Sequence, residues 1–359
     1  MKHLDIAVGM SGGVDSSVAA ALLKEQGNRV VGVTMKLWDG PASRTGGRHG
    51  CYGPGEEEDI EDARQVAAKL GIPFYVIDLS AEYRSEVLDY FRSEYRLGRT
   101  PNPCSRCNRM VKFGTLVKKA HEHGITFDYF ATGHYAKVER VESDGRYVLK
   151  KAKDPGKDQS YFLALLSQEQ LACSLFPLGD RTKGEVRDLA VGFGLAVARK
   201  QDSQDFVDSE FKISADMQNP GPILDRRGHE IGRHSGIGHH TIGQRKGLGI
   251  SSDRPLYVTE IDPARNAIIV GERSEVFGDI LVARDLNWIA VDRLSTPKKV
   301  KARIRYRHEE AAALVQPLGE TEVIVHFEEP QMAITPGQTV VFYDQGTVLG
   351  GGIIDRTKE

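Results

Sequence analysis

The chain has 359 residues, a formal net charge of −2, 40% hydrophobic residues and 27% charged residues. This length predicts two or three domains, and the composition excludes a disordered protein and a small disulfide-framed module. No apolar stretch reaches the roughly 18 residues that a membrane span needs, and the N-terminus enters a strand-like run without a secretory leader. We therefore expect a folded, soluble, cytoplasmic protein that does not coat nucleic acid through bulk charge.

From residue 4 to about residue 135, short apolar runs alternate with helical periodicity. Strands are predicted at 4–10, 30–38, 73–79 and 127–133, and helices at 14–26, 56–70, 81–97 and 110–122. This alternation is typical of a parallel α/β sheet. The glycine-rich stretch 38–55 is predicted to be a mobile loop, and residues 135–152 to be a hairpin followed by helices near 158–173 and 182–194.

After about residue 205 the helical period gives way to alternation of apolar and polar residues between turns. The fold class expected is an N-terminal α/β domain with a parallel sheet, followed by two small β-barrel-like domains. The predicted limits are 1–205, 206–279 and 280–359.

A glycine- and serine-rich turn follows the first predicted strand and opens the first helix. Glycines permit close approach of a ligand, and the first N–H groups of a helix are free to bind an anion. The turn lacks the Gly-Lys-Ser/Thr of a Walker A loop and is not a GxGxxG fingerprint. The alternative is a glycine turn with a capping side chain. The candidate phosphate-binding residues are Gly9, Met10, Ser11, Gly12, Gly13, Val14, Asp15 and Ser16.

The sequence SGGVDS after a first strand resembles the PP-loop of enzymes that adenylate an oxygen with ATP and release pyrophosphate. The resemblance implies that ATP is cleaved between its α and β phosphates, with Mg²⁺ shielding the charge and Asp15 helping to position metal or pyrophosphate. In a doubly wound sheet the loops at the carboxyl ends of the strands meet over one crevice. Met35 would then lie beside adenine, unless it is simply core.

Cys104 and Cys107 lie in a loop between two predicted helices, inside a window, Arg99–His121, with six cations and no carboxylate. Cations and a helix N-terminus stabilise a thiolate, which a sulfur nucleophile requires. The alternatives are half of a zinc site and a structural pair, although no second C-x-x-C occurs. Cys173 is predicted to pack in the core.

Six motifs in this order, SGGVDSS, TPNPCSRCNRMVKFG, ATGHYAKV, KDQSYFL, HTIGQRKGLGI and FEEPQMAITPGQTVVFYDQGTVLGGGII, resemble the tRNA-specific 2-thiouridylase family over essentially the whole chain. The resemblance implies a PP-loop catalytic domain at the N-terminus. It also implies a tRNA-uridine 2-sulfurtransferase that adenylates O2 of the wobble uridine (U34), replaces it with sulfur through a cysteine, and releases AMP and pyrophosphate. Adenylation supplies the leaving group that a uridine carbonyl lacks.

Site residues follow from the resemblance motif by motif. Cys107 matches the nucleophile, and Gly133 matches an ATP contact. Asn102, Pro103 and Cys104 match the segment that faces the target base. The other expected tRNA contacts are His134, Lys157, Asp158, Gln159, Arg305, Tyr306 and Gln338.

One departure from the family affects the sulfur chemistry. Many members have a second cysteine after the Asp-Ser-Gln motif, but here Asp202-Ser203-Gln204 is followed by Asp205 and Phe206. Two routes stay open. In the first, Cys104 is the partner thiol of Cys107. In the second, Cys51, Cys104 and Cys107 hold an iron-sulfur cluster with one open iron.

A second basic window, Arg293–His308, has seven cations and no carboxylate. Lys301, Arg303, Arg305 and Arg307 fall at period two, so one strand over 300–308 would present them on one face, as a row that tracks RNA phosphates. The alternative is a solvated face. The stretch 238–249 is expected to support the catalytic loop and a tRNA stem.

Two other functions share parts of this pattern. A PP-loop ligase for a small molecule would need the ATP loop but not Cys107, and a non-catalytic RNA-binding protein would need only the β domains. For the leading function the expected partners are the tRNAs for Lys, Glu and Gln and a sulfur donor, either a cysteine desulfurase or a sulfur relay carrier.

Overall fold

The computed structural model describes residues 3–40, 51–53, 55–201 and 219–357. The chain divides into two compact units. The α/β unit comprises Met1–Val87, Cys104–Asp208 and Gln345–Val348, and the β-rich unit comprises Leu88–Pro103, Ser209–Asp344 and Leu349–Glu359. None of the helices in these described ranges combines the length and hydropathy needed to cross a bilayer.

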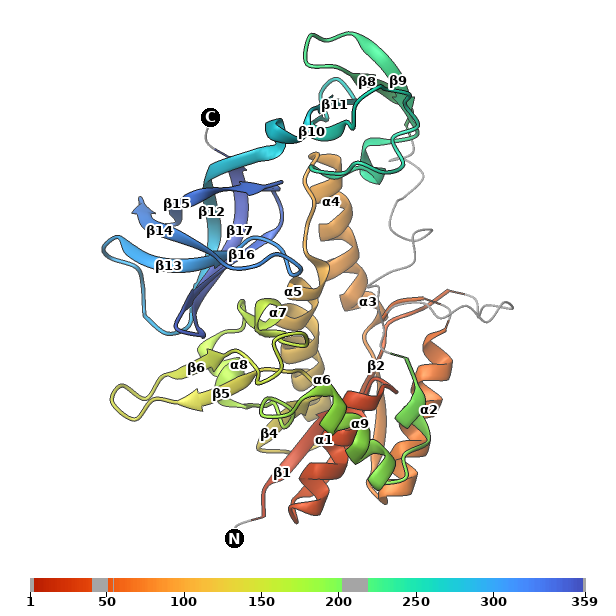
Figure 1. Cartoon of the computed structure of the whole chain (residues 1–359). Helices are drawn as coiled ribbons and strands as arrows, with labels where there is room; N and C mark the ends of the chain where they lie inside the picture. The colour runs from red at the N-terminus through yellow and green to blue at the C-terminus, as the bar shows by residue number, and fades with distance from the viewer. Residues whose placement is uncertain (1–2, 41–50, 54, 202–218, 358–359) are drawn as a thin grey trace. The chain divides into compact units, whose positions relative to one another are not determined.

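A parallel sheet in the order β3-β2-β1-β4-β7 forms the centre of the α/β unit (Figure 1). This confirms the predicted α/β fold, because all four predicted strands are present in one parallel sheet. The fifth strand is too short to show a pattern in the sequence. The bounds are β1 Asp5–Gly9, β2 Arg29–Lys36, β3 Phe74–Asp78, β4 Tyr129–Thr132 and β7 Ser174–Leu175.

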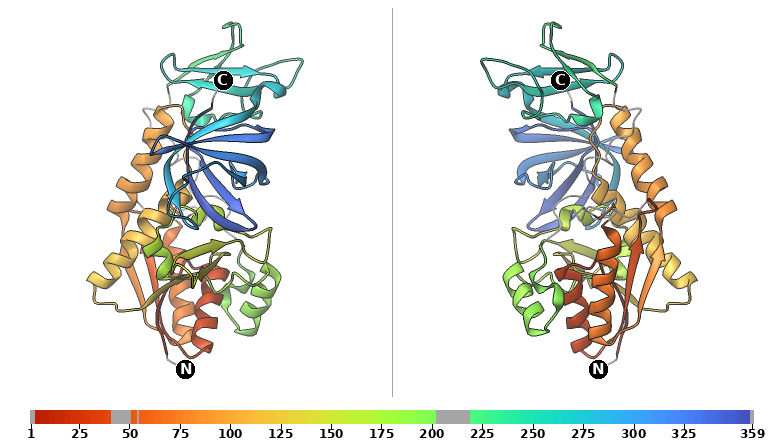
Figure 2. Two further views of the ribbon diagram at one scale, coloured as in Figure 1. Left: turned by 90° about the vertical axis from the view of Figure 1, so that its left-hand side faces the viewer. Right: turned by 90° about the vertical axis from the view of Figure 1, so that its right-hand side faces the viewer.

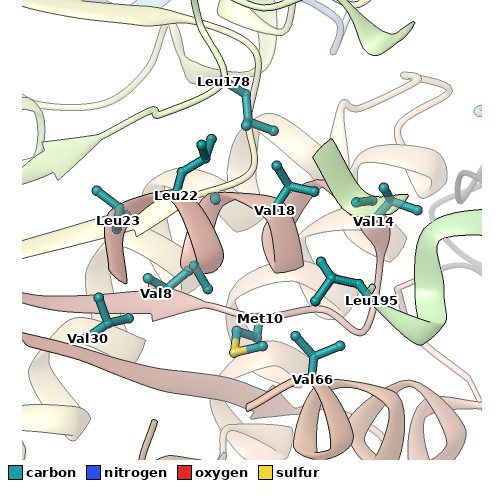
Figure 3. Close-up of a cluster of buried hydrophobic side chains, with 14 of the residues drawn as sticks. Val8, Met10, Val14, Val18, Leu22, Leu23, Val30, Val66, Leu178 and Leu195 are labelled. Atoms are coloured by element: carbon teal, nitrogen blue, oxygen red, sulfur yellow. The ribbon is translucent and has the colours of Figure 1, made fainter. Parts of the chain in front are cut away.

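The core of this unit lies between the sheet and three helices, α1 (Val14–Glu25), α2 (Glu56–Leu70) and α9 (Lys183–Gly192). Figure 3 shows Val8 of β1 with Val18 and Leu22 of α1 in this cluster. α1 is buried on most of its surface. Its alanine side chains are small, and they let the helix lie close to its neighbours. Each fully buried Val or Leu contributes about 1.5–3 kcal/mol to folding.

The predicted hairpin is present as β5 (Lys137–Arg140) paired antiparallel with β6 (Tyr147–Lys150). Its turn contains Gly145 at φ +74°. The other predicted helices are divided more finely than the periodicity suggests, because π-helical stretches at Arg84–Asp89 and Asn108–Thr115 interrupt two of them. The remaining helices are α3 Ser80–Tyr83, α4 Tyr90–Arg96, α5 Pro103–Cys107, α6 Leu116–Glu122, α7 Ser160–Leu163, α8 Gln168–Ala172 and the 3₁₀ turn Ala196–Arg199.

The β-rich unit contains a four-stranded sheet in the order β10-β11-β8-β9. Among the described residues its strand order is that of an open sheet, where the sequence predicted a barrel-like domain. Short 3₁₀ turns lie at Ile237–His239 and Arg273–Val276. The strands are β8 Gly221–Leu224, β9 Glu230–His234, β10 Tyr257–Asp262 and β11 Ala267–Gly271.

The second sheet of this unit runs β12-β15-β14-β13-β16-β17, and pairing of β12 with β17 closes it into a barrel. Its strands, drawn in blue, can be followed from two sides in Figure 2. The closed barrel confirms the β domain predicted at the C-terminus, whereas the domain limits stay a prediction. The bounds are β12 Phe277–Trp288, β13 Lys298–Arg303, β14 Ala311–Leu318, β15 Glu322–Met332, β16 Thr339–Asp344 and β17 Thr347–Thr357.

The predicted single strand over 300–308 is wrong beyond Arg303. β13 ends there, and the chain turns with a hydrogen bond from His308 N to Arg305 O of 3.1 Å. The guanidinium of Arg305 donates to Ile242 O at 2.9 Å and to Thr335 Oγ1. The four cations therefore do not form one row on a strand face.

Two sequence features lie outside the described residues. They are most of the loop predicted to be mobile, 41–50 and 54, and the segment 202–218, which contains Asp202-Ser203-Gln204.

Candidate active site

The loop between β1 and α1 has the geometry of an anion site. Gly12 has φ +67°, and a Cβ there would lie 2.2 Å from Asp59 O, so only glycine fits. Ser11 N donates to Ser16 Oγ at 3.1 Å, and Ser17 Oγ donates to Gly13 O at 2.7 Å. Gly13, the N-cap residue of α1, has no side chain that could cap the helix, and the N–H groups at a helix start are suited to bind an anion.

Asp15, in the first turn of α1, has two partners from distant parts of the chain. Lys183 Nζ donates to its two carboxylate oxygens at 2.8 and 2.9 Å, and Tyr135 OH donates to Oδ1 at 2.9 Å. Only 13% of the Lys183 side chain is exposed. A cation thus lies beside the loop that is predicted to bind the phosphates of ATP. Lys183 and Tyr135 were not predicted as site residues, because neither lies in or next to the loop motif.

The chain that follows β4 passes directly against this loop. A Cβ at Gly133 would lie 2.5 Å from Ser16 N and 2.6 Å from the carbonyl carbon of Asp15, so the backbone of the ATGH motif contacts the start of α1. The predicted meeting of loops from the carboxyl ends of β1 and β4 is therefore confirmed. Met35 is half-buried near the end of β2, and its predicted contact with adenine stays a prediction.

The acidic start of α2 holds the neighbouring loops, a role that its sequence did not reveal. Glu56 accepts hydrogen bonds from Leu37 N at 2.7 Å and Trp38 N at 2.8 Å, directly after β2. Lys200 Nζ donates to Asp59 Oδ1 at 2.6 Å and also contacts Asp62. Residue 200 precedes the Asp202 motif, so this ion pair fixes the chain just before that motif begins.

The cysteine loop lies at the same edge of the sheet. Cys107 is buried at the end of α5, Cys104 is partly exposed, and Cys51 is exposed. All three cysteines lie close to Tyr83, which follows β3. Burial raises the pKa of Tyr83, and the charges of the three cysteines act in the same direction to a smaller extent. Tyr83 also stacks on Tyr52 with ring centroids 5.2 Å apart.

Lys112 lies near both Cys107 and His134, the residue after Gly133. Its charge lowers the pKa of Cys107 and of His134, in each case as the second cause after burial. His134 follows Gly133, which contacts Ser16, and its Nδ1 lies 2.7 Å from Thr132 Oγ1. The thiol of Cys107 and the loop between β1 and α1 therefore both lie near the segment Gly133–His134 that follows β4.

The expectation of a stabilised thiolate is not met in the unliganded protein. Burial raises the pKa of Cys107 to about 11, with Lys112 acting in the opposite direction. Burial also raises the pKa of Cys104 to about 12, and the charges of Cys51 and Cys107 act in the same direction. Both thiols are protonated near neutral pH, because the cost of burying a thiolate exceeds the stabilisation by the nearby cation.

This gives a testable pH dependence. Alkylation of Cys107 in the free protein should accelerate about tenfold per pH unit and show no plateau between about pH 7 and about pH 9.5, because only the thiolate reacts. The measurement is iodoacetamide labelling followed by peptide mapping, with a small reference thiol of ordinary pKa. A plateau for Cys107 near the pKa of the reference thiol would contradict the burial effect.

The three residues of the Lys157-Asp158-Gln159 motif have different surroundings. Asp158 is 2% exposed, and its carboxylate accepts hydrogen bonds from Ala152 N at 3.0 Å and Ser160 Oγ at 2.8 Å. Gln159 Oε1 accepts from Tyr135 N at 3.0 Å. Lys157 is half-buried. The motif thus holds Tyr135, the partner of Asp15, in place.

The remaining predicted tRNA contacts, Asn102, Pro103, Arg305, Tyr306 and Gln338, belong to the β-rich unit. Arg303 lies over the ring of Tyr306, with its guanidinium carbon 5.4 Å from the ring centroid. Gln338 Nε2 donates to Thr100 O at 2.9 Å. The structure therefore gives both Arg305 and Gln338 protein partners.

The basic window Arg99–His121 is compensated by carboxylates from elsewhere in the chain. Arg106 pairs with Glu86 at 2.9 Å, and Lys119 pairs with Glu82 at 2.5 Å. The window is thus less positive than its sequence suggests. Cys173 was predicted to pack in the core, and this is wrong, because it is exposed at the end of α8.

Mg²⁺ and an iron-sulfur cluster, the two metal groups expected from the sequence, need different ligands. Mg²⁺ binds carboxylate and phosphate oxygens, and Asp15 offers a carboxylate at the phosphate loop. For an iron-sulfur cluster the fit is absent: within residues 3–40, 51–53, 55–201 and 219–357, no three His, Cys, Asp or Glu side chains are arranged to hold a metal ion.

Comparison with known proteins gives the family. Family models match residues 4–208 (tRNA methyl transferase HUP domain), 209–272 (tRNA methyl transferase PRC-barrel domain) and 278–354 (Aminomethyltransferase beta-barrel domain). The tRNA-specific 2-thiouridylase MnmA 1 of Caldanaerobacter subterraneus subsp. tengcongensis is 49% identical over 367 residues, covering 98% of each chain. MnmA of Moorella thermoacetica is 49% identical over 360 residues, covering 98% of this chain and 99% of its own.

Among solved structures, a 4-thiouridine synthetase–RNA complex with bound ATP matches 56% of this chain and 44% of its own, at 19% identity and a TM-score of 0.35. The sequence relatives are much closer and extend over nearly the full chain, in agreement with the six motifs identified above. The chain belongs to the tRNA-specific 2-thiouridylase family.

Proposed function

We propose that this protein is a tRNA-uridine 2-sulfurtransferase that uses ATP to replace O2 of the wobble uridine with sulfur. The observation that supports the proposal is that a buried cysteine, Cys107, and the glycine-serine loop before α1 both lie near the segment Gly133–His134. Membership of the thiouridylase family over nearly the whole chain supports it. A small-molecule ligase would need the loop but not the thiol.

The first chemical step takes place at the phosphate loop. O2 of the uridine attacks the α-phosphorus of ATP, the bond from that phosphorus to the bridging oxygen breaks, and pyrophosphate leaves. We expect the N–H groups at the start of α1 and the hydroxyls of Ser11 and Ser16 to hold phosphate oxygens. Lys183 offers a positive charge to the leaving pyrophosphate. Mg²⁺, bound with help from Asp15, would neutralise further charge on the phosphates.

The second step is sulfur transfer. We propose that Cys107 carries a persulfide delivered by a donor protein, either a cysteine desulfurase or a relay carrier. Its terminal sulfur attacks C2 of the adenylated uridine, and AMP leaves with the original oxygen. A second thiol then attacks Sγ of Cys107, which releases the thiocarbonyl and leaves a disulfide. Cys104, on the same helix, and Cys51 are the two candidates for that thiol.

The tRNA contacts proposed from the family motifs are Asn102, Pro103, Cys104, His134, Lys157, Gln159, Arg305 and Tyr306. Asp158 would act through the fold rather than by touching RNA, because its carboxylate is buried and bonded. The expected substrates are the tRNAs for Lys, Glu and Gln.

Incubation with ATP and unmodified tRNA tests the proposed function. Pyrophosphate release should require tRNA, and 2-thiouridine should form when a persulfide donor is added. Release that needs a small carbonyl substrate and ignores tRNA would indicate a ligase. Absence of release under every condition would indicate a non-catalytic RNA-binding protein.

The same preparation separates the two sulfur routes. Anaerobically purified protein that is colourless and free of iron, yet still thiolates tRNA, would end the cluster route. Stoichiometric iron and sulfide that are lost together with activity when Cys51 is replaced would end the dithiol route.

A further inference from the structure

The segment that leads into the cysteines, Gly98–Asn102, has no helix or strand of its own, yet the β-rich unit binds it from several directions. Thr100 N donates to Pro336 O at 2.8 Å, and Thr100 O accepts from Gln338 Nε2 at 2.9 Å. The hydroxyl of Thr100 lies 2.8 Å from that of Thr241. All three polar groups of one residue are therefore held by the two β domains of this unit.

Two glycines allow this close approach. A Cβ at Gly337, which has φ +91°, would lie 3.0 Å from the backbone N of Thr100. A Cβ at Gly98, which has φ +69°, would lie 2.9 Å from Pro263 Cγ. Larger residues would strain the backbone and push the segment away at both points, so these contacts depend on glycine.

Arg99 adds an ion pair that is largely shielded from water. Its side chain is 14% exposed, with Nε donating to Glu94 Oε2 at 2.8 Å and Nη1 donating to Asp355 Oδ1 at 3.0 Å. Nη2 donates to Ile354 O at 3.1 Å. A guanidinium that is withdrawn from water needs such partners. Moving Arg99 away from them would therefore cost free energy.

We infer that residues 98–103 form a tether by which the β-rich unit fixes the cysteine loop, and that Gln338 is a positioning residue for Cys104 and Cys107. The tether ends at Pro103, where α5 begins, and Cys104 is the next residue. Gln338 Nε2 contacts both Thr100 O at 2.9 Å and Pro101 O at 3.4 Å. Its amide thus acts on the backbone that carries the cysteines, whereas the family motif suggested an RNA contact.

The proposed function enters this inference only through what the cysteines do after they are positioned. The contacts that hold the tether are made between residues of the chain itself. The inference can therefore be tested on the full-length protein without either substrate.

The test is Gln338→Met, which keeps the length of the side chain and removes its donor. Losing a hydrogen bond to a backbone carbonyl of the tether should loosen the loop and raise the alkylation rates of Cys104 and Cys107 by about fivefold. Rates are measured with iodoacetamide and peptide mapping, with exposed Cys173 as the internal reference. The matched control is Gln331→Met on the same barrel, whose amide donates to Glu329 O at 2.8 Å and does not touch the tether.

A second variant guards against a trivial loss of folding. Thr241→Val removes the hydroxyl contact to Thr100 and should raise the same two alkylation rates, while thermal unfolding stays close to that of the parent. If neither variant changes the rates, the tether is overturned.

RNA binding distinguishes the two roles of Gln338. A positioning role predicts that Gln338→Met leaves Kd for tRNA within about twofold, keeps tRNA-dependent pyrophosphate release, and lowers kcat for thiolation. Weaker tRNA binding with unchanged alkylation would assign Gln338 to RNA and overturn the inference. A change in alkylation would support the tether even if the protein thiolated no tRNA, so failure of the proposed function is recognisable separately.

Discussion

Replacing Cys107 with serine is expected to leave tRNA-dependent pyrophosphate release near its normal rate and to lower 2-thiouridine formation by roughly a thousandfold or more. Adenylation uses the phosphate loop and O2 of the uridine, and neither contains the thiol. The sulfur that attacks C2 can be carried only by a thiol, and serine cannot form a persulfide. Radiolabelled ATP and mass spectrometry of digested tRNA measure the two steps separately.

The matched control is Cys173→Ser, which changes an exposed thiol at the end of α8. It should alter neither step. Loss of pyrophosphate release in Cys107→Ser would contradict the division between an ATP loop and a sulfur-carrying cysteine. Normal thiolation in that variant would remove Cys107 from the reaction.

Replacing Asp15 with alanine is expected to abolish both steps, with pyrophosphate release lowered about a hundredfold or more. Asp15 and Lys183 form one charged group beside the loop, joined at 2.8 and 2.9 Å. Lys183→Met should lower release to a similar extent, because the charge that faces the leaving pyrophosphate is lost. The double variant should be little worse than either single variant, since the two side chains act as a unit.

The control is Lys153→Met, which removes a positive charge that pairs with Glu185 of α9. Lys153 pairs with Glu185 at 2.9 Å on the surface, and such exposed pairs contribute little to stability. Normal pyrophosphate release in Lys183→Met would show that the lysine only holds Asp15. A Lys183→Met variant that unfolds at a much lower temperature than Lys153→Met would attribute the loss to the fold rather than to catalysis.

The local patterns of the sequence were sufficient for the fold and for the ATP loop. A strand, a glycine turn and a helix start are contiguous, so the residues that build the anion site are adjacent in the chain and visible as SGGVDSS. The same holds for the α/β alternation and for the β-rich C-terminal half, since each element shows its own period. α2 was predicted with the bounds Glu56–Leu70 that the structure shows.

The local sequence pattern could not predict ion pairs or burial where these depend on residues far away along the chain. The cations of 99–121 looked uncompensated, but Glu82 and Glu86 precede that window and pair with two of them. The arginines after residue 303 looked like one strand face, but Ile304 is 2% exposed and the chain turns there. Period-two spacing cannot reveal where a strand stops when an apolar residue continues the alternation.

A glycine-serine loop and a pair of cysteines in an α/β protein with β-rich C-terminal domains could be predicted from the sequence, because those features are short and contiguous. The folded chain was needed to see that Lys183 and Tyr135 contact Asp15, that burial raises the pKa of the cysteine thiols, and that the tether before them is bound through Thr100. The physical reason is that ion pairing, desolvation and close backbone approach depend on which residues meet in space, and these residues are separated by more than a hundred positions along the chain.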